Sequence, residues 1–324
     1  MSRRLLSRLI LLLAAALAPA ASFAQAWLPD KGVFNATLIY NDVSNLAHWG
    51  ATWDAPPQPD GSIDVQAQTL AFLGTYGITD RWTVSAALPY VNTRYKGPPS
   101  HRPPGTPPGT PPPAGFEVDN GEWHGSLTDL RVGLHFQALE RPFALAPFVG
   151  YVMPVTDYYT RGHAATGRHL EETLIGLNVG KSLDPWIPRT YAQARYSYAF
   201  VEKVAGITHD RDNLNIELGT FFTPRWNASL YGAWQWTHGG ITLPVPPSSP
   251  HFLHHDQVGE DEFFNAGFGT GFAVTEEMTL FAIYMEGIEG KNGHKIDQAL
   301  TFGISYGFRP RASAVFAEES STSE

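Results

Sequence analysis

Apolar and polar residues alternate along most of this chain. Between Thr301 and Phe308 ("TFGISYGF"), large apolar residues fill every second position, and only Thr, Gly and Ser lie between them. The segments Asp129–Phe136 and Trp82–Tyr90 alternate in the same way. Residues two apart share one face of a β-strand, so each segment has one apolar and one polar face. The pattern predicts an all-β protein.

The connections between these segments separate a membrane barrel from a soluble sandwich, in which strands would also alternate. Short turns such as "GITDR", "TPR" and "AVTEEM" alternate along the chain with long polar or Pro-rich loops at 46–63, 96–125, 156–170 and 239–261. Short turns on one side and long loops on the other are typical of a transmembrane β-barrel. We predict a closed antiparallel barrel of about twelve strands, with short periplasmic turns and longer external loops, at 32–44, 64–76, 82–95, 126–137, 143–155, 171–181, 189–202, 212–222, 226–238, 262–273, 278–287 and 297–308.

The last strand has a special role in this prediction. Every backbone polar group in lipid must be satisfied within the protein, so the sheet must close and the last strand must pair with the first. Thr301, Gly303, Tyr306 and Phe308 resemble the insertion signal that the outer-membrane barrel assembly machinery reads on final strands. The tail that follows, residues 309–324, is charged and Ser-rich, and we predict a disordered periplasmic extension.

The N-terminus predicts export. Arginines precede an apolar run from Leu9 to Ala18, and Ser22-Phe23-Ala24 supplies the small residues that signal peptidase requires. Residues 1–24 therefore read as a cleaved signal peptide and residues 25–308 as a barrel in the outer membrane of a bacterial cell. The run is too short for a spanning helix, which needs about 20 residues.

Composition excludes several other classes. The chain has no cysteine, which excludes a disulfide framework and a thiolate metal site. A formal net charge of −9 argues against a nucleic-acid partner. Aromatic residues make up 13% and charged residues only 16%, which suits an aromatic-rich surface in contact with outer-membrane lipids.

Several motifs carry a family resemblance. "WLPDKG", "GITDRWTVSAALPYV", "GSLTDLRVGLHFQAL", "PFALAPFVGYVMPVTDY", "GRHLEETLIGLNVGKSL" and "YAQARYSYAF" together resemble the outer-membrane transporter family associated with the meta-pathway of phenol degradation. The resemblance covers roughly residues 27–308 and implies a β-barrel channel, with a broader similarity to the long-chain fatty-acid transporters. Only a few residues separate Gln25 from the first strand, so the long N-terminal plug of those transporters is not carried over.

The polar faces of the strands predict the lining of the lumen. The charged members are Asp129, Arg131, His135, Glu172, Arg195 and Glu217. One interpretation is a constriction whose field selects solutes. The other is a salt-bridged polar core that holds a narrow barrel shut, because interior positions of small barrels are usually filled by side chains.

We interpret the chain as a passive channel for small apolar or aromatic solutes, monomeric or weakly oligomeric, without a cofactor. Two other function classes stay open. His124 and Ser126 have the spacing of the catalytic pair of outer-membrane phospholipases, which would make the chain an esterase. A structural or adhesive barrel would instead act through its external loops.

Two loop features carry further alternatives. In "SPHFLHHDQ", His251, His254, His255 and Asp256 are suited to a divalent metal, although loop histidines are more often solvated. The tract "YKGPPSHRPPGTPPGTPPPAG" favours extended polyproline conformation and reads as a loop spacer or, less readily, as a recognition motif.

Overall fold

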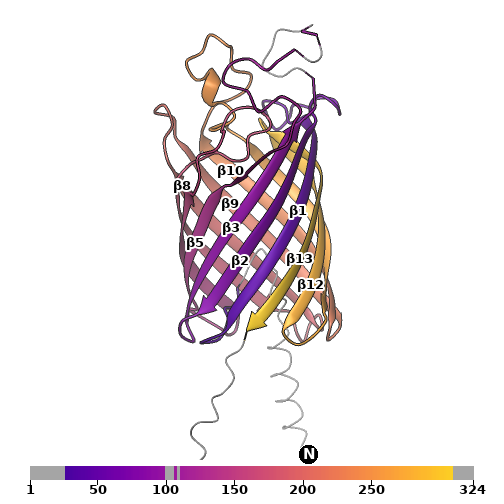
Figure 1. Cartoon of the computed structure of the whole chain (residues 1–324). Coiled ribbons are helices and arrows are strands. Elements are labelled where there is room, and N and C mark those ends of the chain that lie inside the picture. The colour runs from indigo at the N-terminus through magenta and orange to yellow at the C-terminus, as the bar shows by residue number, and fades with distance from the viewer. Residues whose placement is uncertain (1–25, 99–105, 108–109, 309–324) are drawn as a thin grey trace, which may run out of the picture.

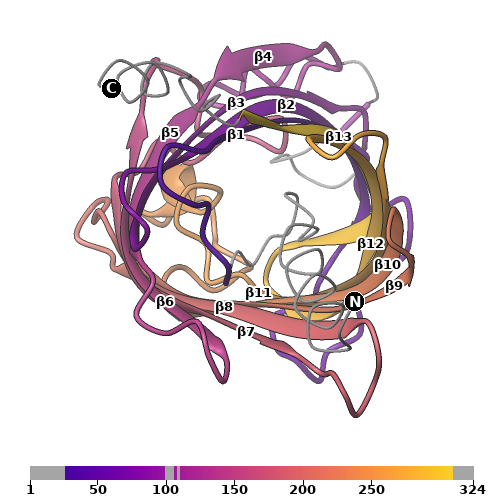
Figure 2. The ribbon, with the colours of Figure 1, turned by 90° about the horizontal axis from the view of Figure 1, so that it is seen from below.

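The computed structural model describes residues 26–98, 106–107 and 110–308, so the predicted signal peptide and the C-terminal tail lie outside the described residues. Within these residues the chain is one antiparallel sheet that closes on itself (Figures 1 and 2). The strands are β1 (Phe34–His48), β2 (Val65–Gly77), β3 (Trp82–Tyr95), β4 (His124–Leu127), β5 (Asp129–Phe136), β6 (Ala144–Pro154), β7 (Glu172–Ser182), β8 (Thr190–Val201), β9 (His209–Thr223), β10 (Trp226–Gly239), β11 (Glu262–Ala273), β12 (Met278–Lys291) and β13 (His294–Phe308).

The closure follows the prediction. β13 pairs with β1 in antiparallel register from Phe34 opposite Phe308 to His48 opposite His294. β4 and β5 both pair with β3 and form one wall strand interrupted at Thr128. The barrel therefore has twelve wall strands, and the prediction of a closed antiparallel twelve-stranded barrel is confirmed.

The two ends of the barrel differ in their connections. Turns at 78–81, 137–143, 183–189, 224–225 and 274–277 join strands at one end, where β1 begins and β13 ends. The other end carries the loops 49–64, 96–123, 155–171, 202–208 and 240–261, drawn at the top of Figure 1, together with the tight hairpin 292–293. The end with short turns is the periplasmic end and the end with long loops is the external end.

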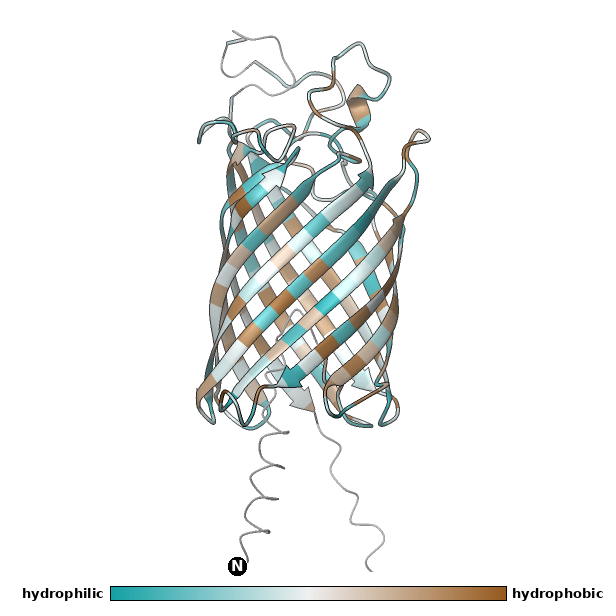
Figure 3. Cartoon of the chain, turned by 180° about the vertical axis from the view of Figure 1, so that it is seen from behind, coloured by the Kyte–Doolittle hydropathy of each residue, from teal (hydrophilic) through white to brown (hydrophobic). Residues whose placement is uncertain are grey.

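Large apolar side chains face outward along the wall. Figure 3 shows hydrophobic and hydrophilic residues alternating along the strands. Exposed aromatic residues lie towards both rims: Trp82, Phe222, Trp226, Phe272 and Phe308 at the periplasmic rim, and Tyr40, Tyr90, Tyr196, Phe200 and Trp236 towards the external rim. The stretches Trp82–Tyr90 and Trp226–Trp236 rise roughly 26–33 Å along their strands. At a strand tilt of about 40° they span about 20–25 Å, the height of a lipid-facing band between aromatic girdles.

The described residues include one 3-10 turn, Phe252–His254, and no helix long and apolar enough to cross a membrane.

The external loops fold into cores of their own. Val118 and Ala164, from two different loops, are buried with Ile63, Val65 and Tyr95. Ile241 and Val258 of the loop 240–261 are buried with Leu170, Ala199 and Val201. These loops are therefore packed against the mouth of the barrel.

A short segment before β1 enters the lumen at the periplasmic end. The Ala26 amide donates to Gln193 Oε1 at 3.4 Å, and the Leu28 amide donates to Gln137 Oε1 at 3.1 Å. The Trp27 ring meets the Tyr191 ring edge-on, with centroids 6.2 Å apart. β8 lies opposite β1 in the closed ring, so the segment crosses the barrel floor, as the indigo trace in Figure 2 shows.

Candidate functional site: the barrel lumen

The six predicted lining residues lie on inward positions of β5, β7, β8 and β9, because their strand neighbours are the outward apolar residues. They do not form one network. They fall into three zones of the lumen. Glu217 lies at the periplasmic floor, Arg131, His135 and Arg195 lie in the middle zone, and Asp129 and Glu172 lie at the external end.

Arg195 stands at the centre of the middle zone. Its guanidinium carbon lies 3.8 Å from the centroid of the Phe148 ring, and its Nη1 donates to Asn178 Oδ1 at 3.4 Å. The His135 ring also stacks with Phe148, with ring centroids 5.3 Å apart, and its Nε2 lies 3.0 Å from Ser85 Oγ. A cation above an aromatic face is stabilised by the ring quadrupole, so Phe148 substitutes in part for a counter-ion.

A glycine makes room for this stack. Gly176 lies opposite Phe148 on the neighbouring strand. A Cβ at Gly176 would come within 2.4 Å of the Phe148 ring. The position therefore needs glycine for Phe148 to lie flat against the wall beneath Arg195.

Two guanidinium groups, those of Arg131 and Arg195, lie in the middle zone of the lumen. Arg131 on β5 and Arg195 on β8 repel one another. Neither forms an ion pair with a carboxylate in the described part of the chain. The lumen thus presents positive charge at mid-height although the whole chain is acidic.

The predicted carboxylates are held elsewhere. Glu217 is buried and accepts hydrogen bonds from Tyr191 Oη at 2.5 Å, Gln193 Nε2 at 2.9 Å and Ser229 Oγ at 3.1 Å. Since Gln193 also binds the Ala26 amide, Glu217 belongs to the periplasmic floor.

The other two carboxylates lie at the external ends of their strands. Asp129 Oδ1 accepts from the hydroxyl of Tyr158 in the loop 155–171. Glu172 forms an ion pair with Arg211, a residue that the sequence analysis did not select. The interpretation of a single salt-bridged core is therefore not supported by these contacts.

The wall opposite Arg195 carries apolar side chains among small polar ones. β1 lies across the ring from β8, and Ile39 faces the lumen from its middle. The neighbouring strands add Leu73 on β2 and Ile283 on β12. Two polar contacts cross this wall, from Thr301 Oγ1 to Asn41 Oδ1 and from Thr37 Oγ1 to Ser305 Oγ, each at 3.0 Å. The lumen therefore has a cationic aromatic side and a side of mixed apolar and small polar residues.

A dense ionic network lies at the external mouth, and sequence reasoning missed it. Arg168 Nη2 lies 2.6 Å from Asp261 Oδ2, and the fully buried His209 lies 3.7 Å from Asp261 Oδ1 and 2.6 Å from the Gly259 carbonyl oxygen. Burial alone would raise the pKa of Asp261, but Arg168 and His209 lower it well below the ordinary range of a carboxyl group. The network joins the loops 155–171 and 240–261 to β9. No local sequence pattern predicts that these three segments lie close together.

The residues of the alternative functions lie apart from this lumen chemistry. His124 Nε2 bonds Asn120 Oδ1 at 3.0 Å, whereas Ser126 Oγ bonds Thr156 Oγ1 at 2.8 Å. The described contacts give no hydrogen bond between His124 and Ser126, so a histidine–serine catalytic pair has no support.

The loop histidines also have separate partners. His255 Nε2 lies 3.2 Å from Asp256 Oδ1, and His254 Nδ1 lies 3.5 Å from Gln257 Oε1. These histidines and His251 do not form a group with ligand atoms close enough to share a metal in the part of the chain that the structure describes.

The predicted insertion residues fall on both faces of β13. Thr301 and Gly303 face inward, and a Cβ at Gly303 would come within 2.1 Å of the Phe281 ring. Tyr306 and Phe308 face outward, and Phe308 stacks on Phe34 of β1 with ring centroids 5.8 Å apart. The two aromatics therefore lie on the seam that closes the barrel.

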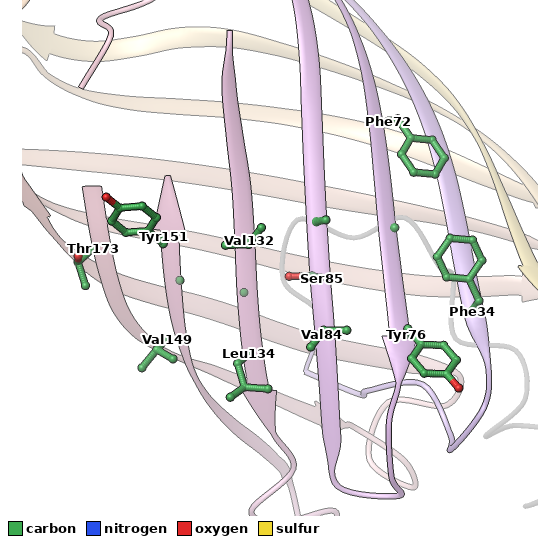
Figure 4. A pocket seen from close by; sticks show the side chains of 14 residues that line it. Phe34, Phe72, Tyr76, Val84, Ser85, Val132, Leu134, Val149, Tyr151 and Thr173 are labelled. Carbon is green, nitrogen blue, oxygen red and sulfur yellow. The ribbon is translucent and has the colours of Figure 1, made fainter. Parts of the chain in front are cut away.

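A groove of about 710 Å³ lies in the wall from β1 to β7 (Figure 4). Its large side chains, among them Phe72, Tyr76 and Leu134, occupy outward positions, and it runs over the small outward residues Gly74 and Ala86. It belongs to the outer surface of the barrel and not to the lumen.

Comparisons with known proteins agree with the barrel architecture. No family model and no curated protein matches the chain. The crystal structure of an outer membrane channel from Pseudomonas putida F1 is 12% identical, covers 90% of this chain and 100% of its own, and superposes with a TM-score of 0.65. The KdgM porin in complex with disordered oligogalacturonate (6% identity, 85% of this chain and 99% of its own, TM-score 0.45) and the NanC porin (7%, 83% and 98%, 0.47) are more distant. The chain has the fold of a bacterial outer-membrane β-barrel.

Proposed function

We propose that this chain is a passive outer-membrane channel for small apolar or aromatic solutes, and that it favours those that carry a carboxylate. The observation that carries the proposal is the middle zone of the lumen. Within the described residues Arg195 and Arg131 form no ion pair with a carboxylate, Phe148 and His135 supply aromatic faces, and the opposite wall carries the apolar Ile39, Leu73 and Ile283. A lining charge sets the local field and with it the ion preference of a pore.

The resemblance to the family of the phenol meta-pathway supports the aromatic class of solute. The apolar ring of a benzoate-like anion would pack against Ile39, while its carboxylate accepts hydrogen bonds from Arg195. Arg binds carboxylates through parallel hydrogen bonds, which adds geometric preference to charge.

The test compares two solutes of similar size in vesicles and planar bilayers. The purified chain should admit benzoate faster than phenol, and Arg195→Ala should lower benzoate flux several-fold while leaving phenol flux nearly unchanged. Arg225→Ala, in a short periplasmic turn, is the matched control and should behave as the wild type. A wild-type barrel that conducts no ions and admits neither solute would refute the proposal.

We also propose that Tyr306 and Phe308 form the aromatic end of the signal read by the assembly machinery. The double variant Tyr306→Ala/Phe308→Ala should lower the heat-modifiable, folded fraction in cells several-fold while export through the inner membrane continues. Phe268→Ala/Phe272→Ala on β11 removes an equally outward and exposed pair and is the control. Equal assembly of the two double variants would mean that β13 is an ordinary strand.

A further inference from the structure

Three histidines from distant parts of the sequence meet at the external mouth. His48 ends β1, His163 lies in the loop 155–171 and His294 begins β13. One ring nitrogen of each can be chosen so that all three lie within 4.8 Å of one another, and all three residues are half-buried. We propose that His48, His163 and His294 form a binding site for a divalent transition metal, with Zn²⁺ as the ion that suits it.

The ligand chemistry supports this choice. Imidazole nitrogen is a preferred ligand of zinc, copper and nickel, and three histidines with an open fourth position are a known arrangement for Zn²⁺. Two nitrogens bound to one tetrahedral zinc, each about 2.0 Å from the ion, lie roughly 3.3 Å apart. His163 Nδ1 and His294 Nε2 are already 3.1 Å apart.

The rings are arranged around a common point. The ring centroids of His48 and His294 lie 4.8 Å apart, and those of His48 and His163 lie 5.2 Å apart. His48 and His294 are direct partners in the β1–β13 ladder, so their backbones are fixed relative to one another.

The third ligand is held in place although it lies in a loop. The Gly162 amide donates to Asp256 Oδ2 at 2.8 Å, and the Ala164 amide donates to Asp119 Oδ1 at 2.9 Å. Ala164 is fully buried, and the Tyr95 ring stacks on His163 with centroids 4.7 Å apart. His163 is therefore fixed on both sides in the chain, and ligand positions set before binding reduce the entropy cost of taking up the ion.

A metal here would join the closing seam of the barrel to the loop 155–171. Any ion that binds the folded state and not the unfolded state raises the apparent stability by mass action. The same loop also carries Arg168, so the ion would add to the ion pair with Asp261 that already holds this loop.

The experiment titrates Zn²⁺ alone into the untagged, detergent-solubilised full chain. We expect one ion per chain, a higher melting temperature with zinc, and the visible absorption of a low-symmetry, nitrogen-bound ion when Co²⁺ replaces zinc. His163→Ala should weaken zinc binding at least 100-fold and abolish the rise in melting temperature. His254→Ala changes a histidine of the neighbouring external loop that is not in the group and should leave both unchanged.

A second variant distinguishes the loss of a metal ligand from a local loss of structure in the loop. His48→Gln lies on the other side of the group, keeps a polar side chain on β1 and should weaken zinc binding to a similar degree, with heat-modifiable migration as the test of folding. A wild type that takes up no zinc would overturn the site. So would variants at His48 and His163 that bind as the wild type does, or a His254→Ala chain that loses the ion.

Discussion

Arg195 and Arg211 are inward arginines on adjacent strands with opposite surroundings. Arg211, at the external end of β9, forms an ion pair with Glu172, and both side chains are largely buried. Arg195, in the middle of β8, has an aromatic ring and an amide but no carboxylate within the described residues. The pair teaches that a lining charge at the mouth can be neutralised by a buried carboxylate, whereas the one at mid-lumen, which we propose meets a solute, has no carboxylate partner among the described residues.

The largest expected effect is on the paired arginine. Arg211→Ala leaves the Glu172 carboxylate buried without its cation, and breaking a buried pair costs about 3–5 kcal/mol. We expect the free energy of unfolding in detergent, measured with denaturant, to fall by about this amount. Arg211→Ala/Glu172→Ala should recover much of the loss, and a single variant as stable as the wild type would contradict the assigned role.

A smaller effect is expected from pH at the Asp261 site. The pKa of Asp261 is lower in the folded chain than the value of about 3.9 in the unfolded chain. Asp261 therefore adds stability that is present above pH 4 and is lost as pH falls towards the folded pKa, on the order of 2 kcal/mol.

The measurement is the free energy of unfolding from pH 7 down to about pH 1.5, which covers the interval between the unfolded and the folded pKa. Asp261→Asn should be less stable than the wild type at pH 7 and should lose less stability on acidification. Arg168→Ala removes the cation that lowers the pKa and should flatten the curve in the same way. Parallel curves for all three proteins would show that other groups cause the acid loss.

The smallest expected effect on stability is at Arg195. Arg195→Ala removes a cation above a ring, worth about 0.5–2 kcal/mol, and also removes the repulsion from Arg131, so we expect a net loss of about 1 kcal/mol or less. Arg195→Gln should be equally stable. A loss as large as that of Arg211→Ala would mean that Arg195 is a structural residue and would end the comparison.

Period-2 alternation was enough to predict the strands, because one face of each strand meets lipid. The range predicted for β3 is the observed one, whereas β12 and β13 run four and three residues further than predicted, to Lys291 and from His294. Those extensions carry charged residues, as in Glu289, Lys291 and Lys295, since they stand above the lipid. The hydrogen-bond ladder continues there after the apolar signal has stopped.

The candidate sites were predicted less well, because their partners depend on register and loops. The inward positions of Arg195 and Glu172 follow from alternation, but the contact of Arg195 with Phe148 and that of Glu172 with Arg211 require the stagger of several strands. Part of the histidine group could have been predicted from the sequence, because the antiparallel pairing that sets Phe34 opposite Phe308 also sets His48 opposite His294. His163 comes from a loop, and no periodic pattern places it.

The height of the outer band has a consequence for reconstitution. The stretches Trp82–Tyr90 and Trp226–Trp236 cover about 20–25 Å, whereas a typical bilayer has a hydrocarbon core of about 30 Å. A barrel cannot lengthen, so a thick bilayer must thin around it, at a fraction of a kcal/mol for each ångström of hydrophobic mismatch. Short-chain lipids match the band, and conductance recorded in long-chain lipids would include the strain of a compressed membrane as well as the selectivity of the lumen.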